Sequence, residues 1–277
     1  MKLRWQITWV IMVVLVILFY SPGVANAKQI RENGVLLEIE STKAQGKVQL
    51  AGKTEKEKIK IMVDKDNKQT WYDIKPVNGM FLEEIWLTQG KGTYTVAVMV
   101  HEYDRKYSYG PQVVVENTEI VNKFLVPTKH IESNNDKIIE LAKEITKNKE
   151  SHRDKAKAFY DWVTSNIRYD FEKYGKHRNA DYDNEYGAVH TLEIRQGVCY
   201  DFAALTAALG RAAGLQVKVV KGEGISGEFR GLHAWNEIYI VEDKQWINVD
   251  TTFGALTGND FFDNANFSES HVKASEY

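Results

Sequence analysis

The stretch Arg195-Gln196-Gly197-Val198-Cys199-Tyr200-Asp201-Phe202-Ala203 contains the only cysteine of the 277-residue sequence. Gly197 breaks the preceding segment, and the alanine- and leucine-rich run that follows predicts a helix from Cys199 to Ala213, ended by Gly214. Cys199 is therefore expected in the first turn of this helix. There the helix dipole and the unpaired backbone N–H groups favour a thiolate and can bind an oxyanion. The stretch predicts a nucleophilic thiol, and the alternative is a small buried apolar residue.

The first 27 residues have the layout of a secretory signal. Lys2 and Arg4 precede an apolar run from Trp9 to Tyr20, and the segment ends in the small-residue triplet Ala25-Asn26-Ala27. This pattern predicts cleavage after Ala27 and a secreted or cell-envelope protein. The alternative is an uncleaved N-terminal membrane anchor, although the apolar run is short for a membrane span.

The overall composition is that of a folded globular protein. The sequence is 43% hydrophobic and 27% charged, and its formal net charge is −2. This balance gives no reason to expect a nucleic-acid partner. A single cysteine cannot form a disulfide within the chain, so a lone thiol in an oxidising compartment favours chemistry over a structural role.

Residues 28–120 are predicted to form an immunoglobulin-like β-sandwich, a binding or spacer module without chemistry of its own. Seven short runs separated by turn residues carry the strand pattern: Val35–Ile39, Lys47–Leu50, Ile59–Val63, Trp71–Ile74, Met80–Leu87, Tyr94–Val100 and Val113–Val115. Gly90-Lys91-Gly92-Thr93 leads into one of these runs, which makes Tyr94 a candidate corner tyrosine. His101, Glu102 and Asp104 cluster at a strand end, and we interpret them as a solvated turn rather than a metal site.

Residues 121–133 are predicted to be a linker, and residues 134–277 a second domain. Two amphipathic helices are expected over Asn135–Lys147 and Arg153–Ile167. The segment from Arg168 to Tyr186 has no helical or strand period. It is either a substrate-facing loop over the thiol or a surface excursion whose aromatic residues pack back on the body.

Gly222-Glu223-Gly224-Ile225-Ser226-Gly227 matches the dinucleotide-binding pattern G-x-G-x-x-G. That motif requires a helix at its end to receive the phosphate, whereas a strand follows here, and Glu223 would repel an anion. The stretch is therefore predicted to be a flexible connection between strands.

Two alternating segments predict an antiparallel hairpin with His233 and Asp250 on one face. Leu232–Ile240 and Gln245–Asp250 both alternate, and the polar Glu242-Asp243-Lys244 between them favours a tight connection. If the connecting loop has an even number of residues, His233 and Asp250 lie opposite or diagonal by one step, within side-chain reach. A carboxylate beside an imidazole fixes its tautomer and leaves the other ring nitrogen free to face a thiol.

These residues resemble the transglutaminase-like superfamily, whose core is papain-like. Gly197-Val198-Cys199, His233-Ala234-Trp235 and Trp246-Ile247-Asn248-Val249-Asp250-Thr251-Thr252 look like its three signature blocks. The resemblance extends from about Asn134 to Phe262. It implies a catalytic Cys199, His233 and Asp250 and an α+β core in which the cysteine helix packs on an antiparallel sheet. It identifies no separate oxyanion-hole residue in this chain.

The resemblance implies acyl chemistry on the amide bonds of proteins or envelope peptides, through an acyl-enzyme on Cys199. Water as the acceptor gives a peptidase or amidase, which we favour, and an amine gives a protein-glutamine crosslinking enzyme. No cofactor or metal is expected. Two other classes stay open: a catalytically inert binding module on the same fold, and a zinc site made of the same thiolate, imidazole and carboxylate.

Overall fold

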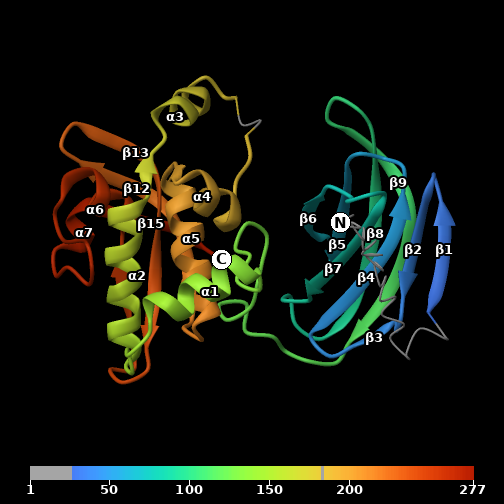
Figure 1. Ribbon diagram of the computed structural model, residues 1–277, viewed down its shortest axis with the longest axis horizontal. Helices are drawn as coiled ribbons and strands as arrows, with labels where there is room; N and C mark the ends of the chain where they lie inside the picture. Colours follow the sequence, from blue (N-terminus) through green and yellow to red (C-terminus); the bar gives the residue numbers. More distant parts are fainter. Residues whose placement is uncertain (1–26, 182–183) are drawn as a thin grey trace, which may run out of the picture.

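The computed structural model describes residues 27–181 and 184–277, which form an all-β body followed by an α+β body (Figure 1). The expected signal segment lies outside the described residues, except for Ala27. Within the described ranges, no helix is both long and apolar enough to cross a membrane.

The all-β body is a sandwich of two sheets with the strand orders β1-β2-β4-β7 and β3-β9-β8-β5-β6. The first sheet comprises β1 (Lys28–Glu32), β2 (Val35–Ile39), β4 (Lys47–Thr54) and β7 (Met80–Trp86). The second comprises β3 (Lys43–Ala44), β5 (Ile59–Lys65), β6 (Lys68–Ile74), β8 (Gly92–Tyr103) and β9 (Lys106–Asn117). Alternate residues of both sheets, such as Leu37, Leu50 and Ile61, are buried between them.

Tyr94 supports the immunoglobulin-like character of this sandwich. It is fully buried, and its hydroxyl donates to the backbone carbonyl of Gly90 at 2.7 Å, four residues upstream. This is the hydrogen bond expected of a corner tyrosine. The predicted fold class of the N-terminal region is confirmed, with the short edge strands β1 and β3 in addition to the predicted ones.

The α+β body is built around one helix and one antiparallel sheet with the order β14-β13-β12-β15. Its sheet strands are β12 (Val217–Ser226), β13 (Phe229–Ile240), β14 (Gln245–Val249) and β15 (His271–Glu276). Its helices are α1 (Asp136–Ile145), α2 (His152–Asn166), α3 (Phe171–Arg178), α4 (Ala188–Ile194), α5 (Cys199–Ala212), α6 (Thr251–Thr257) and α7 (Phe267–Ser270). The short strands β10 (Arg168–Tyr169) and β11 (Gln196–Gly197) pair in parallel.

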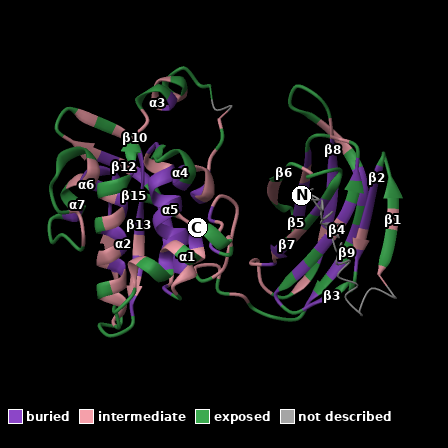
Figure 2. Ribbon diagram, in the orientation of Figure 1, coloured by how far each residue is buried: buried purple, intermediate pink, exposed green. Residues whose placement is uncertain are grey.

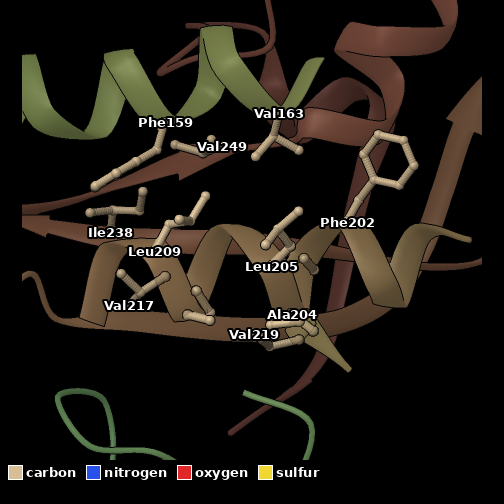
Figure 3. Close-up of a cluster of buried hydrophobic side chains, with 14 of the residues drawn as sticks. Phe159, Val163, Phe202, Ala204, Leu205, Leu209, Val217, Val219, Ile238 and Val249 are labelled. Atoms are coloured by element: carbon tan, nitrogen blue, oxygen red, sulfur yellow. The ribbon is translucent and has the colours of Figure 1, made fainter. Parts of the chain in front are cut away.

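Helix α5 is the centre of the second body. Its residues from Asp201 to Arg211 are all buried, and Figure 2 shows this helix and the inner strands as the most buried part of the body. Leu205 and Leu209 point into a layer of side chains from α2 and the sheet, such as Val163 and Ile238 (Figure 3). The Asn236 side-chain amide in β13 also donates to the Ala203 carbonyl at 3.0 Å. The predicted core, a cysteine-bearing helix on an antiparallel sheet, is confirmed.

The glycine-rich stretch is part of a strand, so its prediction as a flexible connection was wrong. Residues Gly222 to Ser226 belong to β12 and pair with β13, with Gly222 opposite His233. A Cβ atom on Gly224 would lie 2.8 Å from the Cβ of His233, and one on Gly222 would lie 2.0 Å from the Val272 carbonyl oxygen. These glycines therefore allow close approach of neighbouring side chains and strands rather than chain mobility.

The segment 168–186 contains β10 and helix α3, which its lack of period did not predict. Asp170 caps α3 by accepting from the Lys173 amide at 2.8 Å. The helix is largely exposed, with Lys173 as its only buried residue. Because so few of its residues face the body, α3 shows no apolar stripe in the sequence.

Candidate active site

Cys199 is the first residue of α5 and is half-buried. Val198 is the N-cap residue, and its backbone N–H donates to the Asp201 carboxylate at 2.9 Å. Gly197 is required just before this turn, because a Cβ there would lie 2.5 Å from the Cβ of Asp201. The thiol is therefore held at the start of a buried helix, where backbone N–H groups have no partner within the helix.

Lys173 and Asp201 form a buried ion pair that fixes this helix start. The Lys173 ammonium lies 2.7 Å from the Asp201 carboxylate, and the two side chains are 7% and 0% exposed. The same ammonium donates to the Glu185 carbonyl at 2.6 Å. Helix α3 and the segment after it are thereby fastened to the first turn of α5, next to the thiol.

His233 connects the thiol to a buried carboxylate. Its Nε2 lies 2.7 Å from Oδ2 of Asp250, and the imidazole lines the same cavity as Cys199, close enough for the thiol to raise the pKa of His233. The imidazole is stacked on Phe253, with 4.1 Å between ring centroids. The structure thus brings the three predicted residues Cys199, His233 and Asp250 to one place, while their catalytic role stays a prediction.

The strand register explains how His233 reaches Asp250. Asn236 pairs with Val249, so the continued register puts Asp250 opposite Trp235, one same-face step from His233. This is the diagonal arrangement that the alternating pattern predicted. Asp250 is also the N-cap of α6, and its Oδ1 accepts from the Thr252 and Phe253 amides at 2.8 and 3.1 Å.

His271 is a further member of the site that the sequence did not indicate. Its Nε2 lies 2.9 Å from the same Oδ2 of Asp250, and its side chain is fully buried. The ring stacks on Phe267 at 3.8 Å between centroids, and Ser270 Oγ lies 2.8 Å from its Nδ1. The alternating run of β15 was the available signal, but only its pairing with β12 brings His271 to Asp250.

The group His233, Asp250 and His271 has the donor atoms of a possible metal site, with one ligand atom from each residue all within 4.8 Å of one another. In this structure both rings instead hydrogen-bond to one carboxylate oxygen. A metal ion at about 2.0–2.2 Å from each ligand would have to replace both hydrogen bonds. The zinc site considered from the sequence consisted of Cys199, His233 and Asp250. In the part of the chain that the structure describes, the group with suitable geometry contains His271 in place of Cys199.

The electrostatics of the site favour a charged His233 beside an ionised Asp250. Burial lowers the pKa of His233, but the Asp250 carboxylate and Cys199 outweigh burial, so this pKa is raised. Burial likewise opposes ionisation of Asp250, yet His233 and His271 outweigh it and hold the pKa of Asp250 well below its usual range. An imidazolium next to the sulfur is the partner that a thiolate nucleophile requires.

A cavity of about 270 Å³ opens beside these residues, with Cys199 and His233 in its wall. Residues of β10, α3, β12, β13 and α6 supply the rest of the wall. Tyr169, Phe171 and Tyr174 of the segment 168–186 line this cavity, so part of that segment lies beside the thiol. That this segment faces a substrate stays a prediction.

Comparisons with known proteins place the α+β body. Residues 139–251 match the model of the transglutaminase-like superfamily. Kyphoscoliosis peptidase of Mus musculus is 28% identical over 127 residues, which are 42% of this chain and 18% of that protein. The uncharacterized protein YebA of Bacillus subtilis is 28% identical over 151 residues, which are 49% of this chain and 19% of that protein. This chain therefore matches about a fifth of the length of these curated relatives.

Two solved structures match this chain at lower sequence identity. A proposed cysteine protease from Cytophaga hutchinsonii is 17% identical with a TM-score of 0.43, over 91% of this chain and 82% of that chain. Red sea bream transglutaminase is 12% identical with a TM-score of 0.34, over 79% of this chain and 50% of that chain. The family match covers the segment that carries Cys199, His233 and Asp250. Over residues 139–251, the α+β body of this chain is therefore similar to the transglutaminase-like superfamily.

Proposed function

We propose that this protein is an exported thiol-dependent enzyme that acts on amide bonds of proteins or cell-envelope peptides. The observation that carries the proposal is one buried imidazole, His233, which bonds to the Asp250 carboxylate and lines the same cavity as the Cys199 thiol. This order of groups is the arrangement of a thiol nucleophile, its base and the residue that orients the base. The signal-like N-terminal segment supports export.

In the proposed reaction, the Cys199 thiolate attacks the amide carbonyl while His233 carries the proton. In this reaction, backbone N–H groups at the start of α5 stabilise the oxyanion. His233 then protonates the leaving amine, and an acyl-enzyme remains on Cys199. Because Nε2 of His233 bonds to Asp250, Nδ1 is the ring nitrogen that exchanges a proton with the sulfur in this proposal.

Hydrolysis of the acyl-enzyme is our preferred outcome, and transfer to an amine, as in crosslinking, is the alternative. The preference rests on the name of the mouse relative, which is a peptidase, and on the expected export of this chain. Both outcomes use the same three side chains. They differ only in which acceptor reaches the acyl-enzyme.

One experiment distinguishes these outcomes. The protein is incubated with a peptide library and a labelled primary amine, and mass spectrometry identifies the products. Cleaved or deamidated peptides indicate hydrolysis, and incorporated label indicates transfer. Cys199→Ala should abolish every product without unfolding the protein. Equal product formation by wild type and Cys199→Ala would end the proposal.

A further inference from the structure

The cavity beside Cys199 is apolar except for the groups at its catalytic edge. Its wall includes five aromatic side chains: Tyr169, Phe171, Tyr174, Phe229 and Phe253. Leu232 and Leu256 complete the apolar part, and none of the lining residues is Lys, Arg, Asp or Glu. Away from the edge formed by Cys199 and His233, a charged side chain in this cavity would lose its hydration without gaining a partner of opposite charge.

The wall of the cavity is held in place because its aromatic rings pack on one another. Tyr169 contacts Phe171 edge to face at 5.0 Å between centroids, and Phe229 contacts Phe253 at 6.1 Å. Helix α3, which supplies Phe171 and Tyr174, is fixed to the cysteine helix through the Lys173–Asp201 pair. A preformed wall spares a ligand the cost of ordering it.

The mouth of the cavity leaves apolar surface in water. Leu232 is 89% exposed, Phe171 68% and Leu256 46%. Exposed apolar side chains gathered at one cavity mark a binding site, because a ligand that covers them removes that surface from water. The Cys199 sulfur lies in the same wall, and the acyl group is the part of a substrate that stays bonded to this sulfur through the second half of the reaction.

We propose that this cavity binds a large apolar or aromatic side chain of a peptide substrate, within two residues on the acyl side of the attacked amide. The inference rests on the proposed function and adds its substrate class. Because burying a side chain of this size stabilises binding, a Phe or Leu substrate should react about 10- to 100-fold faster than its Ala counterpart in kcat/KM. Lys and Glu counterparts should react no faster than Ala.

The test uses dipeptidyl chloromethyl ketones that carry Phe, Leu, Ala, Lys or Glu at either position. The Cys199 thiolate displaces chloride and forms a C–S bond, so the rate is measured whether the natural acceptor is water or an amine. Mass spectrometry follows the modification, and Cys199 is the only cysteine in the sequence. Each rate is divided by the iodoacetamide rate of the same protein. This ratio separates side-chain recognition from thiol reactivity.

Two variants sharpen the test. Leu232→Glu places a carboxylate at the mouth of the cavity and should raise the relative rate of the Lys reagent about 2- to 5-fold, because an exposed ion pair is weak. Ile120→Glu is the matched control, since Ile120 is 75% exposed and does not line the cavity. Its reagent preferences should equal those of the wild type.

The two proposals fail in different ways. Fast iodoacetamide labelling at mildly acidic pH, combined with equal relative rates for all five side chains, would refute the cavity assignment and leave the thiol enzyme intact. If every reagent labelled Cys199 as slowly as it labels the amino acid cysteine in solution, the proposed function itself would be refuted. A faster rate for Lys or Glu than for Phe in the wild type would also overturn the assignment.

Discussion

Replacing His271 by Leu should destabilise the α+β body and alter the reactivity of Cys199, although His271 is not expected to touch the substrate. The ring donates to Oδ2 of Asp250 at 2.9 Å in a fully buried environment. A hydrogen bond to a charged group contributes about 1.5–3 kcal/mol, so the free energy of unfolding should fall by that amount. His233 would then be the only side chain that bonds to this oxygen among the described residues.

The pH dependence of the lost unfolding free energy shows whether the bond between His271 and Asp250 is its cause. His271 helps to hold the pKa of Asp250 below its ordinary value, so the ionised carboxylate stabilises the fold above about pH 4. This contribution is lost as the pH falls through the pKa of the folded state. The difference in stability between wild type and His271→Leu should therefore be full at neutral pH and shrink in acid.

The assay is urea unfolding followed by the helical circular dichroism signal, because all helices of the described residues lie in the α+β body. Iodoacetamide labelling against pH reports the second effect. With one donor fewer on Asp250, His233 should hold its proton to higher pH and the labelling profile should shift. His271→Gln supplies an N–H donor and should restore part of both properties. A loss below about 0.5 kcal/mol, independent of pH, would refute the reasoning.

The remaining predictions concern the support of the site and its chemistry. Lys173→Met leaves Asp201 buried without its cation and should cost about 3–5 kcal/mol in urea unfolding; a loss below 1 kcal/mol would contradict this. Gly224→Ala should displace His233 and slow iodoacetamide labelling at least about 10-fold. Gly231→Ala is the control, because Gly231 pairs with Gly224 but its added Cβ would lie at an ordinary 3.6 Å from the Phe229 ring, so the labelling rate should not change. On the same substrate, Asp250→Asn should retain more activity than His233→Ala, because the imidazole itself carries the proton.

The sequence alone predicts those features of the site that depend on residues close together in the chain. The alanine- and leucine-rich run after Cys199 predicts α5 because helix propensity accumulates along neighbouring residues. The alternation around His233 and Asp250 predicts their shared face because the side-chain period of a strand is two. Neither signal depends on knowing which segments meet in space.

Other parts of the site depend on contacts between distant segments. His271 reaches Asp250 only because β15 pairs with β12 at the sheet edge. Lys173 reaches Asp201 from a short exposed helix without an apolar stripe. Gly222 and Gly224 were interpreted as signs of flexibility, yet they are required by the close approach of Val272 and His233. No local pattern distinguishes a glycine in a mobile loop from a glycine in a crowded strand.

The predicted linker has a further consequence for where the chain can be cut. Phe124 accepts a backbone hydrogen bond from Val217 at 2.9 Å, and the buried Arg211 donates to the Val126 carbonyl at 3.0 Å. Ile131 is fully buried in the core of the second body. Removal of the residues before 134 would take these contacts away from the second body, and Nη1 of Arg211 would lose both of its acceptors, the Val126 carbonyl and the Thr128 hydroxyl. A fragment that contains the complete second body must therefore begin no later than Asn122.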